Sequence, residues 1–120
     1  MITVVLDPDR RELSRTVKAI RSVFGQGGEV IMFSDPLIAS YYIEENAVDV
    51  LFTQVSMLKM SGFEIKEKLL HIQPGAKIFY MADNDDYAVA AMHDRVNGYL
   101  VKPVTAEAIR RSTIDLKLVI

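Results

Sequence analysis

The hydrophobic residues of the chain fall into five short apolar runs that alternate with segments of helical periodicity. The runs are continuous and rich in β-branched residues, as in strands buried on both faces, and they cover residues 2–6, 30–33, 48–53, 76–81 and 99–101. The segments between them repeat apolar residues every three or four positions and predict helices at about 9–24, 36–43, 62–72, 87–96 and 105–114. Five strands, each followed by a helix, predict a doubly wound α/β domain with a parallel sheet covered on both faces.

The ends of the predicted strands are where function is expected, because ligands of such sheets bind at the carboxyl ends of the strands. Seven residues follow or end these strands and are therefore the candidate functional residues: Asp7, Pro8, Asp9, Gln54, Met81, Ala82 and Lys102.

Composition narrows the class of protein. The 120 residues suit one domain, 1–120, since domains commonly hold roughly 100–150 residues. A formal net charge of −2 argues against direct nucleic-acid binding by the domain, and the first apolar run is too short to span a membrane. The absence of cysteine excludes thiolate chemistry and fits a cytoplasmic protein. The apolar end, Asp115 to Ile120, indicates that this domain is the N-terminal part of a longer protein.

Five short motifs occur in an order and at a spacing that are informative only together. They are Val5-Leu6-Asp7, the run 48–53, Met60-Ser61-Gly62-Phe63-Glu64, the run 78–82 and Gly98-Tyr99-Leu100-Val101-Lys102-Pro103. With them the chain resembles the response-regulator receiver family over nearly its whole length. The resemblance implies a CheY-like, flavodoxin-like three-layer sandwich with strand order 2-1-3-4-5. The stretch from Asp86 to Pro103 is similar to receivers attached to LytTR-type DNA-binding domains.

The resemblance implies a phosphoryl switch built from a few residues. In the family, an aspartate at the end of the third strand accepts a phosphoryl group, and two acids after the first strand hold magnesium. A Ser or Thr after the fourth strand and a Lys after the fifth contact the phosphoryl group. A cis-proline follows that lysine, and an aromatic residue of the fifth strand changes rotamer.

In this chain the match fails at three of those positions. Gln54 stands at the phosphoacceptor position, and an amide cannot form the acyl phosphate of a carboxylate. Pro8 replaces the second acid and Met81 the hydroxyl, so we expect weak or absent magnesium binding and no other cofactor. Shifting the first loop by one residue would bring Asp9 into the acidic pair but would not restore Gln54 or Met81. The sequence therefore predicts a degenerate, non-enzymatic receiver that controls an attached output domain, DNA-binding by the resemblance.

The remaining candidates have two interpretations each. Lys102 either enters the cleft before a cis-Pro103, where it can pair with Asp7 as a structural salt bridge, or is a surface lysine before an ordinary trans turn. Asp9 caps a helix or forms a partial metal site with Asp7. Gln54 mimics one signalling state or fills the site as a neutral plug. Tyr99 is a rotamer switch or an ordinary strand aromatic. We expect His71 and His93 at the surface, and solvated faces at Asp94, Arg95, Arg110 and Arg111.

The resemblance also implies a surface for homodimers or partners on the fourth helix, fifth strand and fifth helix. Its expected residues are Tyr87, Val89, Met92, His93, Tyr99 and Arg110.

Two other classes of function stay open at this point. Asp7 and Asp9 resemble the nucleophile motif of haloacid-dehalogenase-type phosphatases, with Asp85 and Asp86 as later acids, although Arg11 departs from that pattern. A flavodoxin-like cofactor binder would need a glycine- or hydroxyl-rich phosphate loop after the first strand, and Pro8 and Arg10 do not suit one.

Overall fold

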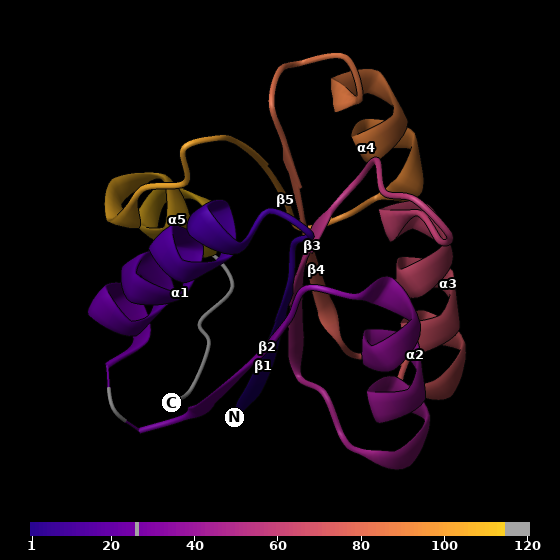
Figure 1. The fold of residues 1–120 in the computed structure, drawn as a ribbon. Coiled ribbons are helices and arrows are strands. Elements are labelled where there is room, and N and C mark those ends of the chain that lie inside the picture. The colour runs from indigo at the N-terminus through magenta and orange to yellow at the C-terminus, as the bar shows by residue number, and fades with distance from the viewer. Residues whose placement is uncertain (26, 115–120) are drawn as a thin grey trace.

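Five parallel strands form one sheet in the order β2-β1-β3-β4-β5, and helices cover both of its faces (Figure 1). This computed structural model describes residues 1–25 and 27–114. The strands are β1 (Ile2–Leu6), β2 (Glu29–Phe33), β3 (Val50–Gln54), β4 (Lys77–Ala82) and β5 (Gly98–Val101). The helices are α1 (Arg10–Phe24), α2 (Pro36–Glu45), α3 (Gly62–Ile72), α4 (Ala88–Asp94) and α5 (Ala106–Thr113). The predicted fold class and strand order are confirmed.

The helices divide unevenly between the two faces. Figure 1 shows α1 and α5 on one side of the sheet and α2, α3 and α4 on the other. Neighbouring strand residues point to opposite faces, so Val5 and Phe52 pack with α1 and α5, whereas Val4 and Leu51 pack with α2 and α3. The central strands are buried on both sides, which explains their continuous apolar sequences.

Local sequence signals start most of the helices. The carboxylate of Asp9 accepts hydrogen bonds from two backbone amides at the start of α1, and that of Asp35 accepts one at the start of α2. Ser61 and Glu64 form a reciprocal capping box at the start of α3, and the Thr105 hydroxyl caps α5. Each cap satisfies amides that lack a partner within the helix.

Three predicted boundaries are wrong by more than one residue: the start of β3, the end of α4 and the end of α2, which extends to Glu45 and not to 43. β3 begins at Val50 and not at Val48, because the Val48 amide donates to the Gln73 side chain at 2.9 Å and not to a strand. β3 extends to Gln54, which is paired with Met81 of β4. α4 ends at Asp94, before the predicted Val96, because Arg95 takes a left-handed conformation with φ 57°. The apolar residues 115–120, from which we predicted that a longer protein follows, lie outside the described residues.

Within the ranges 1–25 and 27–114, no helix has the length and apolar character needed to cross a membrane.

Candidate functional site

The carboxyl ends of β1, β3, β4 and β5 bring four of the predicted residues to one edge of the sheet. Gln54 and Met81 are register partners at the ends of β3 and β4, and the Met81 carbonyl accepts from the Val55 amide at 3.0 Å. The Lys102 amide donates to the Ala82 carbonyl at 2.8 Å and so places that lysine beside the end of β4. The candidate site is therefore one spatial cluster.

Asp7 and Lys102 form a buried ion pair at this edge. The Lys102 ammonium lies 2.5 Å from Asp7 Oδ2, and the two side chains are 7% and 1% exposed, respectively. Asp7 Oδ1 accepts a hydrogen bond from the Asp9 amide at 3.0 Å. Burial raises the pKa of Asp7, and the hydrogen bonds from Lys102 and the Asp9 amide offset this only in part. In this structure Lys102 therefore lies in the cleft and pairs with Asp7. The peptide bond between Lys102 and Pro103 is cis.

The first loop does not offer the ligands of a magnesium ion. Pro8 is exposed and has no ligand atom in its side chain. Asp9 caps α1, and the backbone hydrogen bond from Glu12 is the main cause that lowers the pKa of Asp9. Asp7 is already paired with Lys102, and no group of three or more His, Cys, Asp or Glu side chains gathers as a metal site in the described part of the chain. This donor set does not fit magnesium, which prefers several oxygen ligands in near-octahedral geometry.

Gln54 and Met81 occupy the places where the family's reactive groups are expected. The Gln54 side chain is 8% exposed, and its Oε1 has no hydrogen-bond partner among the described residues. The Met81 side chain is fully buried and packs in the cluster that also contains Phe52, Phe79 and Leu100. A neutral amide at position 54 and a thioether at position 81 provide no carboxylate nucleophile and no hydroxyl donor at those two positions.

Gly62, which was quoted above only as part of the motif at residues 60–64, positions the end of β3. The Gly62 amide donates to the Val55 carbonyl at 2.8 Å, and a Cβ at this residue would overlap the carbonyl oxygen of Gln54. Only glycine lets α3 begin this close to the Gln54 backbone. The signal in the sequence was the placement of a glycine directly after the cap residue Ser61.

The Tyr99 hydroxyl joins β5 to the loop between β4 and α4. It donates to the Asn84 carbonyl at 2.5 Å and accepts from the Tyr87 amide at 3.3 Å. Burial raises the pKa of Tyr99. In this structure the ring is therefore held to the loop, which favours neither of the two interpretations of Tyr99 as a rotamer switch or an ordinary strand aromatic.

The expected partner surface has apolar and exposed members. Val89 and Met92 are 67% and 80% exposed, and Val101 of β5, which was not among the expected members of this surface, is 42% exposed. The remaining members are exposed or partly buried: Tyr87, His93, Tyr99 and Arg110. His71 is exposed on α3.

The prediction that Asp94 lies on a solvated face is wrong. Its Oδ2 accepts from the hydroxyl of the fully buried Tyr80 at 2.9 Å and lies 3.7 Å from the Lys66 ammonium. The Lys66 side chain is only 5% exposed. Sequence spacing gave no signal for this network, because its three residues come from different elements.

Comparison with known proteins agrees with this geometry. The family model of the response regulator receiver domain matches residues 5–113, and the chain belongs to this family. It is therefore a receiver domain of two-component signalling, and receivers are signalling modules.

Individual relatives have the same character. An uncharacterized response regulatory protein of Vibrio cholerae serotype O1 is 32% identical over 72 residues, 60% of this chain and 28% of that protein. The sensory transduction protein LytT of Enterococcus faecalis is 31% identical over 61 residues, 51% of this chain and 25% of LytT. The crystal structure of a receiver domain protein from Clostridium thermocellum has a TM-score of 0.77 and 26% identity, with 95% of this chain and 91% of that chain covered.

The matched segments cover about a quarter of the length of these two curated relatives. Neither the comparisons nor the site favour the haloacid-dehalogenase alternative, because Asp9 is engaged as a helix cap and Asp85 and Asp86 are exposed in the loop before α4.

Proposed function

We propose that this receiver is a pseudo-receiver, a non-enzymatic interaction module that works without phosphorylation of an aspartate. The observation that carries the proposal is the amide of Gln54 at the end of β3, at the edge of the sheet that also holds Asp7 and Lys102. Phosphotransfer to this position needs a carboxylate nucleophile, and an amide nitrogen or oxygen is not one.

The surroundings of Gln54 support the same conclusion. The ammonium of Lys102 is already paired with the carboxylate of Asp7, so it needs no phosphoryl group as a counterion. Met81 offers no hydrogen bond and fills its site with a packed side chain. With Pro8 in place of an acid, the cleft holds one carboxylate against one ammonium and has little affinity for a divalent cation.

The wider role follows the family. We propose that residues 1–120 form one domain at the N-terminal end of a longer cytoplasmic protein and control an attached, DNA-binding output domain. The similarity to LytT, named a sensory transduction protein, supports a role in signal transduction. We propose a homodimer through α4, β5 and α5, where Val89, Met92 and Val101 supply exposed apolar area.

The test of phosphorylation uses acetyl phosphate with magnesium and reads the intact mass. The wild-type chain should gain no phosphoryl group, and beryllofluoride should leave the amide spectrum of the cleft unchanged. A variant with Pro8→Asp, Gln54→Asp and Met81→Thr restores the missing groups beside Lys102 and should become labelled. Stoichiometric labelling of the wild-type chain would overturn the proposal.

The test of the dimer is the solution mass by light scattering. Met92→Asp places a charge on the α4 surface and should shift the chain towards the monomer mass. Ile38→Asp changes a residue that is 55% exposed on α2, outside the proposed interface, and should leave the mass unchanged. A monomeric wild-type chain at high concentration, or an equal effect of both changes, speaks against this interface.

A further inference from the structure

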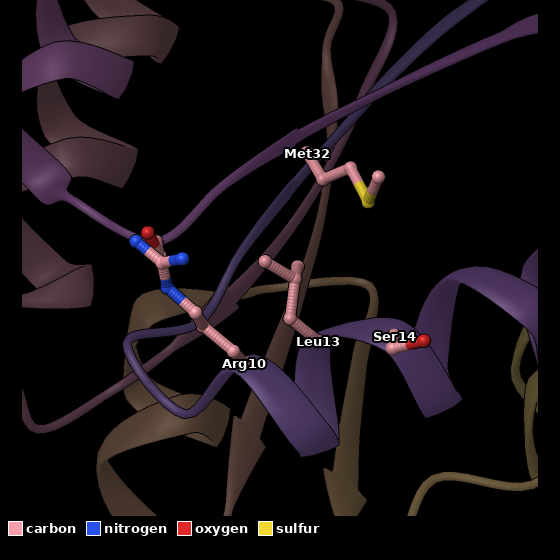
Figure 2. Close-up of a pocket in the computed structure, with 5 residues that line it drawn as sticks. Arg10, Leu13, Ser14 and Met32 are labelled. Atoms are coloured by element: carbon pink, nitrogen blue, oxygen red, sulfur yellow. The ribbon is translucent and has the colours of Figure 1, made fainter.

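The layer formed by α1 and α5 leaves one end of the edge strand β2 uncovered. Val30 of β2 packs against the core under α1, but Met32, two residues further along on the same face, is 53% exposed. Between α1 and this end of β2 lies a hollow of about 380 Å³, lined by Arg10, Leu13, Ser14, Met32 and Ser34. We call it the α1–β2 hollow (Figure 2).

The lining of the hollow combines an apolar floor with donors. Figure 2 shows Leu13 and Met32 between Arg10 on one side and Ser14 on the other. The lining contains no acidic residue, and Arg10 forms no salt bridge with any residue that the structure describes. A guanidinium in this position can bind a carboxylate through two parallel hydrogen bonds.

The surroundings of the hollow are positively charged. The exposed basic residues of α1 are Arg10, Arg11, Arg15, Lys18 and Arg21, five of the 14 lysines and arginines of the chain. The single acid of this helix, Glu12, already binds Arg15 at 3.0 Å. The chain as a whole has a net charge of −2, so the excess of positive charge is local to this face. A local positive field favours a negatively charged partner at this face.

A second hollow of about 180 Å³ continues the path beyond Ser34, which lines both. Its apolar lining consists of Pro8, Pro36 and Leu58, and the Leu58 side chain is 87% exposed. Its one acid, Asp35, lies 3.9 Å from the ammonium of Lys59, which lines the same hollow. β2 is also an edge strand, whose outer backbone groups face no other strand of the sheet. Two hollows that share Ser34 and each contain apolar and polar residues, beside an edge strand, suit an extended segment of chain.

We propose that the α1–β2 hollow and its continuation form a docking groove for an extended acidic segment of a partner protein. An apolar side chain of the segment occupies the space between Leu13 and Met32, and a neighbouring carboxylate binds Arg10. The groove is separate from the surface of α4, β5 and α5. It also goes beyond the pseudo-receiver proposal, because binding here does not depend on the chemistry of Gln54.

The test is a titration of the isotope-labelled chain with an end-blocked peptide of alternating aspartate and leucine, followed by NMR. Saturable shifts should be confined to the amides of the residues that line the two hollows. Arg10→Ala and Met32→Ser should each weaken binding roughly fivefold, as expected for loss of about 1 kcal/mol. Arg21→Ala removes an exposed charge from the far end of the same helix and should change affinity less than about twofold.

Two further probes distinguish a groove from a merely basic surface. A peptide of alternating lysine and leucine and a peptide of alternating aspartate and serine should each bind at least about fivefold more weakly, because each lacks one half of the recognition. The proposal is overturned if the acidic apolar peptide gives no saturable shift. It is also overturned if Arg21→Ala weakens binding as much as Arg10→Ala, or if duplex DNA shifts the same amides equally well.

Discussion

Lys102, directly after β5, reaches Asp7, directly after β1, and their charged groups meet at 2.5 Å although β3 and β4 lie between these strands. The ion pair therefore spans the ends of β3 and β4, where Gln54 and Met81 stand. In this receiver the charge of Lys102 is paired with a carboxylate of the same domain, so the ion pair has a structural role at the sheet edge.

Removing the lysine should destabilise the domain strongly. Lys102→Met leaves the carboxylate of Asp7 buried without its partner, and we expect a loss of about 3–5 kcal/mol in the free energy of unfolding by urea. The double change Asp7→Asn with Lys102→Met removes both charges and should recover most of the loss. Lys18→Met, at an exposed position of α1, serves as the control. A loss no larger than that of the control would contradict a buried ion pair.

The stability should depend on pH through Asp7 in an unusual direction. The folded-state pKa of Asp7 is raised above 3.8, so the folded protein binds this proton more tightly than the unfolded chain. The stability that Asp7 contributes is then fully present below pH 3.8 and is lost as pH rises through the folded-state pKa. The measurement is the difference in free energy of unfolding between the wild type and Asp7→Asn, from pH 3 to 7, and it should fall with rising pH.

Asp9 supplies the opposite control for that experiment. Its pKa is lowered by hydrogen bonds from the start of α1, so its contribution is present above pH 3.8 and is lost as pH falls through the folded-state pKa. The difference between the wild type and Asp9→Asn should therefore rise with pH. Equal slopes for the two variants would contradict the assignment of Asp7 as the buried acid.

The contact of α3 with the end of β3 predicts a cost for any side chain at Gly62. Gly62→Ala forces the helix start away from the Gln54 carbonyl and should cost about 1–3 kcal/mol. Gly75→Ala is the matched control, since a Cβ at that residue meets nothing within 4 Å, and it should be neutral or slightly stabilising. Thermal or urea unfolding of both variants measures the difference, and equal effects would show that the contact is loose.

The hydroxyl of Tyr80, which donates to Asp94 at the end of α4, should stabilise that end of the helix. Tyr80→Phe removes the bond to Asp94 and should cost about 1–3 kcal/mol, because Asp94 loses a donor in a partly buried site. Tyr41→Phe, at a side chain that is 65% exposed, should have little effect. A double-mutant cycle with Asp94→Asn isolates the interaction, and additive losses would mean that the two groups do not interact.

The hydroxyl of Tyr99 should protect the start of α4 from local opening. Tyr99→Phe removes the acceptor of the Tyr87 amide and the donor to the Asn84 carbonyl, at a cost of about 0.5–1.5 kcal/mol. Hydrogen exchange at the Tyr87 amide should become faster by a larger factor than exchange at amides in the centre of β4. Unchanged exchange at that amide would show that other contacts hold the loop.

Much of the fold was predictable because its signals are local. The continuous apolar runs of the central strands reflect burial on both faces, and the caps at Asp9, Asp35 and Ser61 start their helices through hydrogen bonds within four residues. The strand-end residues of the candidate site were also predictable, since parallel strands bring their carboxyl ends to one edge. The boundaries of β3 and α4 were less so, because they depend on the distant partner Gln73 and on one left-handed residue, Arg95.

The alternation of strands and helices and the absence of a carboxylate at residue 54 were readable from the amino-acid order alone. Packing between distant segments determined which charges met. It selected the pairing of Lys102 with Asp7 from the alternatives that the sequence left open, buried Lys66 beside Asp94 and left Met32 uncovered beside α1. These relationships depend on how each helix lies on the sheet, and that placement results from contacts summed over both cores, which no local pattern encodes.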